Sequence, residues 1–247
     1  MSKGLLEEPP ARRPLAPSPH SRSPLLLGDE AVALGALHGG ISAAYGYPGT
    51  PSTEIFETLV ARADDHGVVA HWCTNEKTAY EQALGASMVG TRVLVSMKHV
   101  GLNVAMDPFV NSALVRIHGG LVVVVADDPG MHSSQNEQDS RVLADFAGVP
   151  CLEPSTQQEA YDMTRAAFDL SEGLCVPVMV RLVTRLCHGR SEVTSSPPRA
   201  RTKPSRAPEP RDWTLLPANS RRLWDQLLSR REETEAAVAH WSEDGGG

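Results

Sequence analysis

Several signatures of nucleotide-binding and hydrolytic enzymes are missing from this sequence. It contains no G-x-x-x-x-G-K-[ST] phosphate loop and no G-x-G-x-x-G turn, so neither a mononucleotide nor a dinucleotide has its usual pyrophosphate cradle. The G-x-S-x-G nucleophile elbow is also absent, which argues against a hydrolase. The formal net charge of -7 disfavours nucleic acid as a partner.

Cysteine pairs and long apolar runs are missing as well. The four cysteines are scattered without a C-x-x-C pair, so we expect no metal site, neither a zinc cluster nor an iron-sulfur ligand set. We interpret them as reduced thiols of a cytoplasmic protein. No run of about 18 apolar residues exists, and arginines and prolines stand where a signal peptide has its apolar stretch. We therefore expect no membrane segment and no export.

Composition divides the chain into four parts. Residues 1–24 are rich in proline, serine and arginine and predict a disordered arm. Residues 25–190 have a globular composition, and residues 191–212 return to low complexity, which predicts a flexible linker. Residues 213–247 place Leu223, Leu227 and Leu228 at helical spacing, which predicts one amphipathic C-terminal helix and a tail.

Within the globular part, six short apolar runs alternate with helical patterns. The runs cover residues 41–47, 68–73, 92–97, 120–126, 149–153 and 176–182, and the expected helices cover 51–65, 75–90, 103–118, 136–147 and 156–172. The runs at 92–97 and 120–126 lack the alternation of a half-exposed strand, as expected when helices cover both faces of a sheet. This predicts an α/β fold with a doubly wound, mostly parallel sheet. Ligands of such folds bind outside the carboxyl ends of the strands.

The segments expected at those strand ends are chemically unusual. They read "GYPGTPST", "TNEKT", "KHVGLN" and "ADDPGMHSSQNEQDS". Glu76 would lie in the first turn of its helix, where the helix dipole favours a carboxylate without any further role. The face beneath it carries only small side chains, Ala79, Ala83, Ser87 and Gly90. Such a face either admits a planar ligand or another backbone, or simply packs tightly on the rest of the fold.

Three stretches carry a resemblance to a known family: "GYPGTPSTEI", "NEKTAYEQALGASMVGTRVLVSMKHVGLNVAMDP" and "ADDPGMHSSQNEQDSR". Together with "LLPANSRR", they make roughly residues 25–225 resemble the 2-oxoacid:ferredoxin oxidoreductases. Within that family, the sequence most resembles the pyrimidine-binding domain in the large subunit of the indolepyruvate:ferredoxin oxidoreductases. The resemblance implies the thiamine diphosphate-binding fold, and it implies that Glu76 is the catalytic glutamate that contacts N1′ of the cofactor's aminopyrimidine ring.

Other site residues follow from the same resemblance. Lys98, His99 and Asn103 would flank the pyrimidine; the alternative is a solvated lysine and a histidine bonded to backbone. Thr50 matches a threonine that would hydrogen-bond the 2-oxoacid carboxylate, and the alternative is a helix N-cap. We also expect His132 to bind substrate, because its loop is too rich in hydrogen-bond donors for a simple turn.

The sequence departs from the family in what it does not contain. It has no G-D-G diphosphate motif with its magnesium ligands and no cysteine-rich cluster motifs. We therefore expect a partner that supplies the diphosphate domain, the magnesium and the iron-sulfur clusters. The implied function is the pyrimidine-binding subunit or fragment of an enzyme that oxidatively decarboxylates an arylpyruvate or indolepyruvate to an acyl-CoA, inactive alone.

Two alternatives stay open at this point. One is a subunit of a non-oxidative thiamine diphosphate decarboxylase or carboligase, and the other is a non-catalytic remnant that acts as a binding protein. In a monomer, the small-residue helix face and the amphipathic C-terminal helix would leave apolar surface uncovered. We therefore predict a homo-oligomer or an obligate heteromer.

Overall fold

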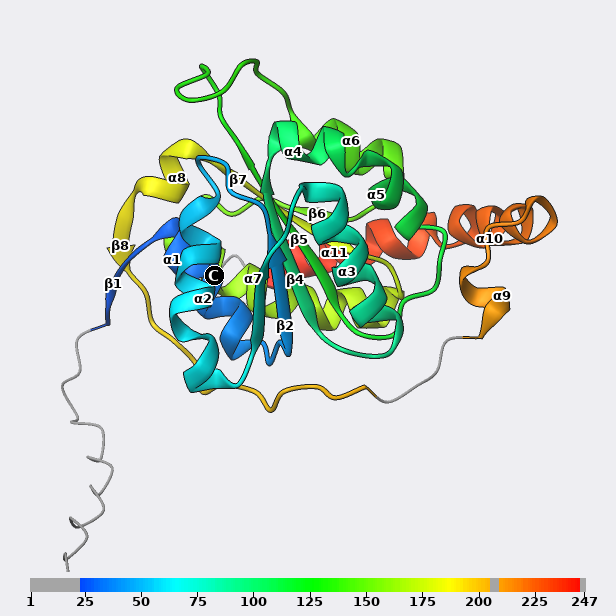
Figure 1. Ribbon diagram of the computed structural model, residues 1–247, viewed down its shortest axis with the longest axis horizontal. Helices are drawn as coiled ribbons and strands as arrows, with labels where there is room; N and C mark the ends of the chain where they lie inside the picture. The colour runs from blue at the N-terminus through cyan, green and yellow to red at the C-terminus, as the bar shows by residue number, and fades with distance from the viewer. Residues whose placement is uncertain (1–22, 205–208, 245–247) are drawn as a thin grey trace, which may run out of the picture.

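Six parallel strands form the central sheet of the protein (Figure 1). The structure, a computed structural model, describes residues 23–204 and 209–244. The sheet order is β3-β2-β4-β5-β7-β6. The strands are β2 (Ala43–Gly46), β3 (Val69–Trp72), β4 (Val93–Lys98), β5 (Leu121–Asp127), β6 (Cys151–Leu152) and β7 (Val178–Val183). Each apolar run predicted as a strand overlaps one of these, and the predicted α/β class is confirmed.

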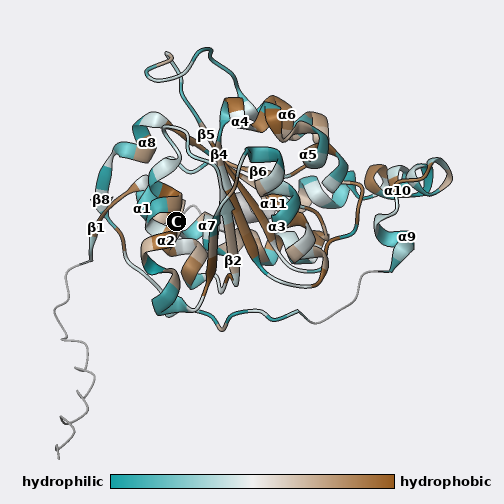
Figure 2. Cartoon of the chain, in the orientation of Figure 1, coloured by the Kyte–Doolittle hydropathy of each residue, from teal (hydrophilic) through white to brown (hydrophobic). Residues whose placement is uncertain are grey.

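Helices cover both faces of this sheet. One face carries α1 (Gly28–His38), α2 (Thr53–His66) and α7 (Gln157–Leu174), and the other carries α3 (Glu76–Met88), α4 (His99–Val104), α5 (Met106–Ser112) and α6 (Ser140–Ala147). Successive strand residues enter opposite cores: Leu94 packs with the first set and Val95 with the second. Both sides of the strands are therefore apolar, as the hydropathy colouring shows (Figure 2).

The connections change direction between β2 and β4. The chain leaves β2 through α2 on one face to reach β3, and it leaves β4 through α4 and α5 on the other face to reach β5. Because β2 pairs with both β3 and β4, the crossovers diverge at the carboxyl ends of β2 and β4. Such a switch point is where ligands of doubly wound sheets bind.

Within residues 25–190, one predicted helix was wrong and a long buried helix was missed. The two short helices α4 and α5 replace the predicted helix 103–118. Pro108 has no backbone N–H to donate to the Val104 carbonyl, and its ring crowds the preceding turn, so a continuous helix cannot pass this point. Helix α1 was not predicted at all. Ten of its eleven residues are buried, so its sequence shows no alternation between an apolar and a polar face.

A short antiparallel pair, β1 (Leu25–Leu27) with β8 (Arg190–Glu192), brings the two ends of the globular domain together. Helix α8 (Thr184–His188) precedes β8. The segment that follows, residues 193–204 of the predicted linker, runs along the amino ends of the strands in Figure 1. Its backbone N–H groups at Arg199 and Thr202 donate to the carbonyls of His38 and Gly40.

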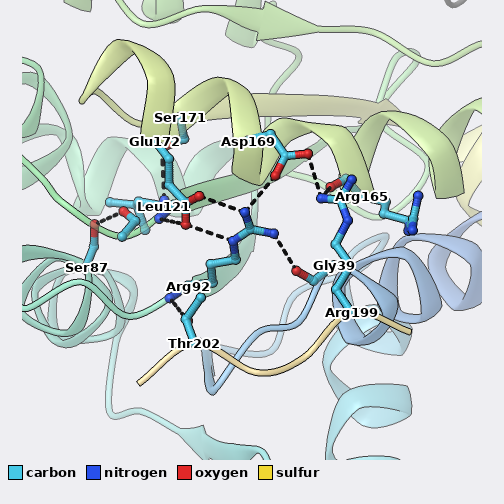
Figure 3. A network of polar contacts seen from close by, with 12 residues as sticks. Gly39, Ser87, Arg92, Leu121, Arg165, Asp169, Ser171, Glu172, Arg199 and Thr202 are labelled. Carbon is cyan, nitrogen blue, oxygen red and sulfur yellow. Dashed lines mark hydrogen bonds and ion pairs between the residues drawn. The ribbon is translucent and has the colours of Figure 1, made fainter. Parts of the chain in front are cut away.

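Arg92 joins this segment to α7 (Figure 3). Its backbone N–H donates to the Thr202 hydroxyl at 2.7 Å, and its guanidinium binds Glu172 through two bonds of 2.7 and 2.8 Å. A further guanidinium bond of 2.6 Å reaches Asp169, which also pairs with Arg199. Residues 193–204 are thus tied to the body of the fold at several points.

Three helices follow where one was predicted: α9 (Pro210–Trp213), α10 (Pro217–Ser229) and α11 (Arg231–Asp244). Leu223 is buried, and Leu227 packs on the core beside α6. The predicted arm 1–24 lies outside the described residues except for Ser23 and Pro24, as do residues 245–247 of the predicted tail. In the described part of the chain, no helix is long and apolar enough to cross a membrane, and all four cysteines are free thiols.

Candidate functional site

The segments after β2, β4 and β5 meet at the carboxyl edge of the sheet. Lys98, the last residue of β4, packs its aliphatic chain against Gly49, where an added Cβ would come within 2.8 Å of the Lys98 Cδ. The Lys98 ammonium donates to the Ser133 carbonyl at 3.3 Å, and the Ser133 hydroxyl donates to the Thr50 carbonyl at 3.4 Å. Three of the four unusual segments are therefore in contact.

Asp128 anchors the long loop after β5, which projects beyond the sheet in Figure 1. Its carboxylate, almost fully buried, accepts hydrogen bonds of 2.8 Å from the Ser133 N–H, the Ser134 hydroxyl and the Thr184 hydroxyl. Burial alone would raise the pKa of Asp128, but these hydrogen bonds outweigh it and hold the pKa well below its usual range. The loop is thus fixed by a charged acceptor at its base.

Glu76 begins α3, as predicted, and the Asn75 side chain caps the helix by accepting from the Thr78 N–H at 2.9 Å. The Glu76 side chain is directed toward α4. A Cβ at Gly101 would come within 2.5 Å of its Oε1. Glu76 is 9% exposed as a residue, and no hydrogen bond or ion pair joins its carboxylate to the described part of the chain. Its oxygens are not among the fully buried unpaired atoms, so they keep contact with solvent and are available to a ligand donor.

His99, the first residue of α4, is fully buried at the same edge. Its Nε2 lies 3.0 Å from the Asn136 carbonyl. Because a carbonyl only accepts, Nε2 donates in this contact, and in the tautomer with its proton on Nε2 the Nδ1 atom is an acceptor. That Nδ1 is buried without a hydrogen-bond partner. The alternative of a histidine bonded to backbone therefore accounts for Nε2 of His99 only. Nδ1 is available to a ligand.

The remaining predicted residues are exposed. Thr50 lies in the loop after β2, and α2 begins at Thr53 with Ser52 as its N-cap residue, so the alternative of Thr50 as a helix N-cap is wrong. Asn103 on α4 is exposed and makes no hydrogen bond within the described residues. His132 lies exposed in the loop after β5, and its backbone N–H contributes to the binding of Asp128.

The small-residue face of α3 does not line the site. Ala79, Ala83 and Ser87 are fully buried against the sheet and α5, and the Ser87 hydroxyl donates to the Gly119 carbonyl at 2.5 Å. The suggestion that this face leaves room for a planar ring or a facing subunit was therefore wrong. Tight packing within the chain accounts for it, because small side chains let α3 approach β2 and β4 closely.

Two residues of the site were missed by sequence reasoning. Gly101 lies within the quoted "KHVGLN" stretch, but only its contact with Glu76 reveals why a side chain is excluded there. Asp128 stood in "ADDPGMHSSQ" beside the loop, and the density of donors that follows it was the available signal. A buried acceptor is the natural partner of such donors.

A family model described as pyruvate flavodoxin/ferredoxin oxidoreductase, thiamine diphosphate-binding, matches residues 34–222. The chain belongs to this family. The match includes the loop after β2, the start of α3, the whole of α4 and the loop after β5, which are the segments that form the candidate site.

Individual relatives agree with this assignment. Indolepyruvate oxidoreductase subunit IorA of Pyrococcus abyssi is 54% identical over 169 residues, which cover 68% of this chain and 26% of the relative. Indolepyruvate oxidoreductase subunit IorA of Thermococcus kodakarensis is 44% identical over 229 residues, which cover 89% of this chain and 35% of the relative. The 2-oxoglutarate synthase subunit KorA of Methanothermobacter thermautotrophicus is 29% identical over 77% of this chain and 52% of its own length.

A solved structure shows the same fold. The 2-oxoglutarate:ferredoxin oxidoreductase of Magnetococcus marinus, with 2-oxoglutarate, coenzyme A and succinyl-CoA bound, superposes with a TM-score of 0.68. It is 18% identical, and the superposition covers 92% of this chain and 46% of that one. This chain therefore spans about a quarter to a third of the indolepyruvate oxidoreductase subunits named above and about half of the solved chain.

Proposed function

We propose that this chain forms the pyrimidine-binding half of a thiamine diphosphate site in a 2-oxoacid:ferredoxin oxidoreductase. The observation that carries the proposal is Glu76, whose unpaired carboxylate is directed toward Gly101 of α4 at the carboxyl edge of the sheet. Glu76 also lies within residues 34–222, which match the family model.

The residues present fit an aminopyrimidine ring. Such a ring carries donors and acceptors at its edge, and this edge of the sheet offers a carboxylate at Glu76 and an orphaned acceptor at His99 Nδ1. Gly101 keeps the space beside the carboxylate free of a side chain. Burial of a polar ring edge requires partners of this kind, because unpaired polar groups are costly away from water.

Each site residue then has a defined task. When bound, thiamine diphosphate supplies the nucleophilic carbon that attacks the 2-oxo group. Glu76 holds a proton at N1′ of the aminopyrimidine, which promotes proton removal at C2. Lys98, His99 and Asn103 position the ring, with His99 Nδ1 accepting from it. Thr50 and His132, both exposed at the same edge, bind the carboxylate of the 2-oxoacid.

A partner must complete the site under this proposal. It would carry the diphosphate-binding domain with magnesium and the iron-sulfur clusters, since the sequence contains neither motif. The relatives' names call them subunits, which supports association with a second chain or further domains. We expect the assembly to be cytoplasmic, with this chain inactive by itself.

The proposed reaction is oxidative decarboxylation of an arylpyruvate of the indolepyruvate type to an acyl-CoA. The choice of substrate class follows the relatives of 42–54% identity named for indolepyruvate, against 29% for one named for 2-oxoglutarate.

Assay of the assembled complex tests this choice. With coenzyme A and a viologen as electron acceptor, we expect kcat/KM for indolepyruvate to exceed that for 2-oxoglutarate by about 100-fold or more, because a pocket that accepts an indole leaves the second carboxylate of 2-oxoglutarate without a partner. Equal or reversed preference would contradict the substrate class. Product formation without reduction of the viologen would point to the non-oxidative alternative.

A further inference from the structure

A second cluster of ionisable side chains lies where α1, α2 and α8 converge, and the proposed reaction does not use it. Asp29 is in the first turn of α1, Glu54 in the first turn of α2 and His188 at the end of α8. Each places one potential ligand atom within 4.8 Å of the others, the only group of three or more such residues in the described part of the chain. Helix α1 contacts both α2 and α8, and α1 and α2 pack on the sheet face opposite α3 and Glu76.

Asp29 is an unusual residue to find at this junction. It is fully buried, and neither carboxylate oxygen has a hydrogen-bond partner of good geometry in the described part of the chain apart from a weak contact with the Cys187 thiol. The Cys187 thiol lies beside it, but a thiol is a weak donor that compensates little of the lost hydration. Carboxylates of this kind are costly in a protein interior unless they are paired or bind a metal.

A second carboxylate lies next to the first. The Glu54 Oε2 is also buried without a partner, while its Oε1 faces His188 Nε2 at 3.9 Å. Unpaired carboxylate oxygens of Asp29 and Glu54 therefore lie at the same junction, with the His188 ring beside them.

Solvent reaches the cluster from one side. The side chains of Glu54 and His188 are 38% and 40% exposed, whereas Asp29 closes the inner end. Gly28 brings α1 against α8 so closely that a Cβ there would collide with the Leu186 carbonyl. The backbone around Asp29 is therefore fixed, while the two outer side chains are free to rotate toward an ion.

We propose that Asp29, Glu54 and His188 bind a divalent transition-metal ion of the zinc class and thereby lock α1, α2 and α8 together. Imidazole with two carboxylates is a donor set that suits Zn²⁺. Tetrahedral zinc needs ligand atoms roughly 3.4 Å apart, so Glu54 and His188 have to move by about 1 Å. The role is structural and separate from the thiamine diphosphate site.

The competing account needs no metal. In it, Asp29 keeps a proton and shares it with Glu54, as close carboxyl pairs do. Sequence spacing gave no hint of either arrangement, because the three residues are separated by 25 and 134 positions along the chain.

Zinc titration of the full chain separates the two accounts. The chain is stripped with a chelator, and Zn²⁺ affinity is measured by competition with a chromophoric chelator, with bound metal quantified by elemental analysis. We expect one equivalent to bind at this site and to raise the melting temperature by about 5–10 °C at zinc about 100-fold above Kd. Asp29→Asn and His188→Gln should each weaken binding by about tenfold or more.

Glu57→Gln is the matched control, since Glu57 is exposed one turn further along α2. It should leave both affinity and the thermal shift unchanged. Should Asp29→Asn fail to fold, the exposed His188 still provides a substitution that leaves the core intact. The proposal is overturned if the stripped chain binds no zinc, or if zinc binds equally well to His188→Gln and to the unsubstituted chain.

Discussion

Gly101 decides where the Glu76 carboxylate can lie. A Cβ there would come within 2.5 Å of Oε1 and 2.7 Å of Cγ, so Gly101→Ala must displace the carboxylate. Alanine is also the better helix former, by about 1 kcal/mol, so the fold itself should not suffer. We expect the affinity of the assembled complex for thiamine diphosphate to fall about tenfold or more, measured by calorimetric titration.

Gly85→Ala provides the control for that substitution. Gly85 lies in α3 with nothing within 4 Å of an added Cβ, so the variant gains helix propensity and meets no neighbour. Its cofactor affinity should equal that of the unsubstituted chain. Equal affinity for Gly101→Ala as well would show that the Glu76 position is not what the cofactor requires.

The identity of Glu76 was available from sequence, but its surroundings were not. Its place in the first helical turn followed from Asn75 and the preceding strand, and its role from the family resemblance. The neighbours that complete the site come from other segments: Gly101 from α4 and Asn136 from the loop after β5. Contacts between residues far apart in sequence leave no local pattern to read.

At the scale of elements, the loop between β5 and α6 depends on the charge of Asp128. Its folded-state pKa lies below the unfolded value of about 3.9, so the charged form stabilises the fold. That contribution is fully present above about pH 4 and is lost as the pH falls through the folded-state pKa. Asp128→Asn removes it, so the difference in unfolding free energy between the two chains should narrow below about pH 4.

Chemical denaturation at several pH values checks this prediction. Asp65→Asn, an exposed aspartate on α2, serves as the control and should differ little from the unsubstituted chain at any pH. A stability difference for Asp128→Asn that stays constant down to pH 2 would contradict the stabilising role of the Asp128 charge.

A strand or helix could be predicted from sequence only where burial leaves a recognisable hydrophobic pattern in it. The six apolar runs gave the six strands of the sheet because strands covered on both faces are apolar throughout. Helix α1 escaped notice for the same reason, since near-complete burial erases its amphipathic period. Strands β1 and β8 are three residues long and pair across more than 160 positions, so neither carries a signal of its own.

At the scale of the whole molecule, the chain should not hold the cofactor unaided. Most of the affinity for a diphosphate cofactor comes from magnesium and the groups that bind the diphosphate, and the sequence contains no G-D-G motif for them. We expect the isolated chain to bind thiamine diphosphate only weakly in calorimetric titration with magnesium present. Submicromolar binding, worth more than about 8 kcal/mol, would contradict a divided site.

Association with another chain remains a prediction at this scale. Exposed apolar side chains of α6 and α10 line one cavity: Phe146 is 71% exposed, and Trp224 and Leu228 about half. Such surface is more often covered than left in water. Any test of catalysis therefore belongs to the assembled complex.

The central claim is that Glu76 acts on the cofactor, and exchange of the C2 proton of thiamine diphosphate measures this directly. In the assembled complex in deuterated buffer, with acid quench and NMR, Glu76→Gln should slow C2 exchange by about 100-fold or more, the usual contribution of a positioned proton-transfer group. If Glu76 only complements the dipole of α3, the substitution should cost at most about 1 kcal/mol of stability. In that case C2 would exchange as fast as with the unsubstituted chain, and the assignment of the site would be wrong.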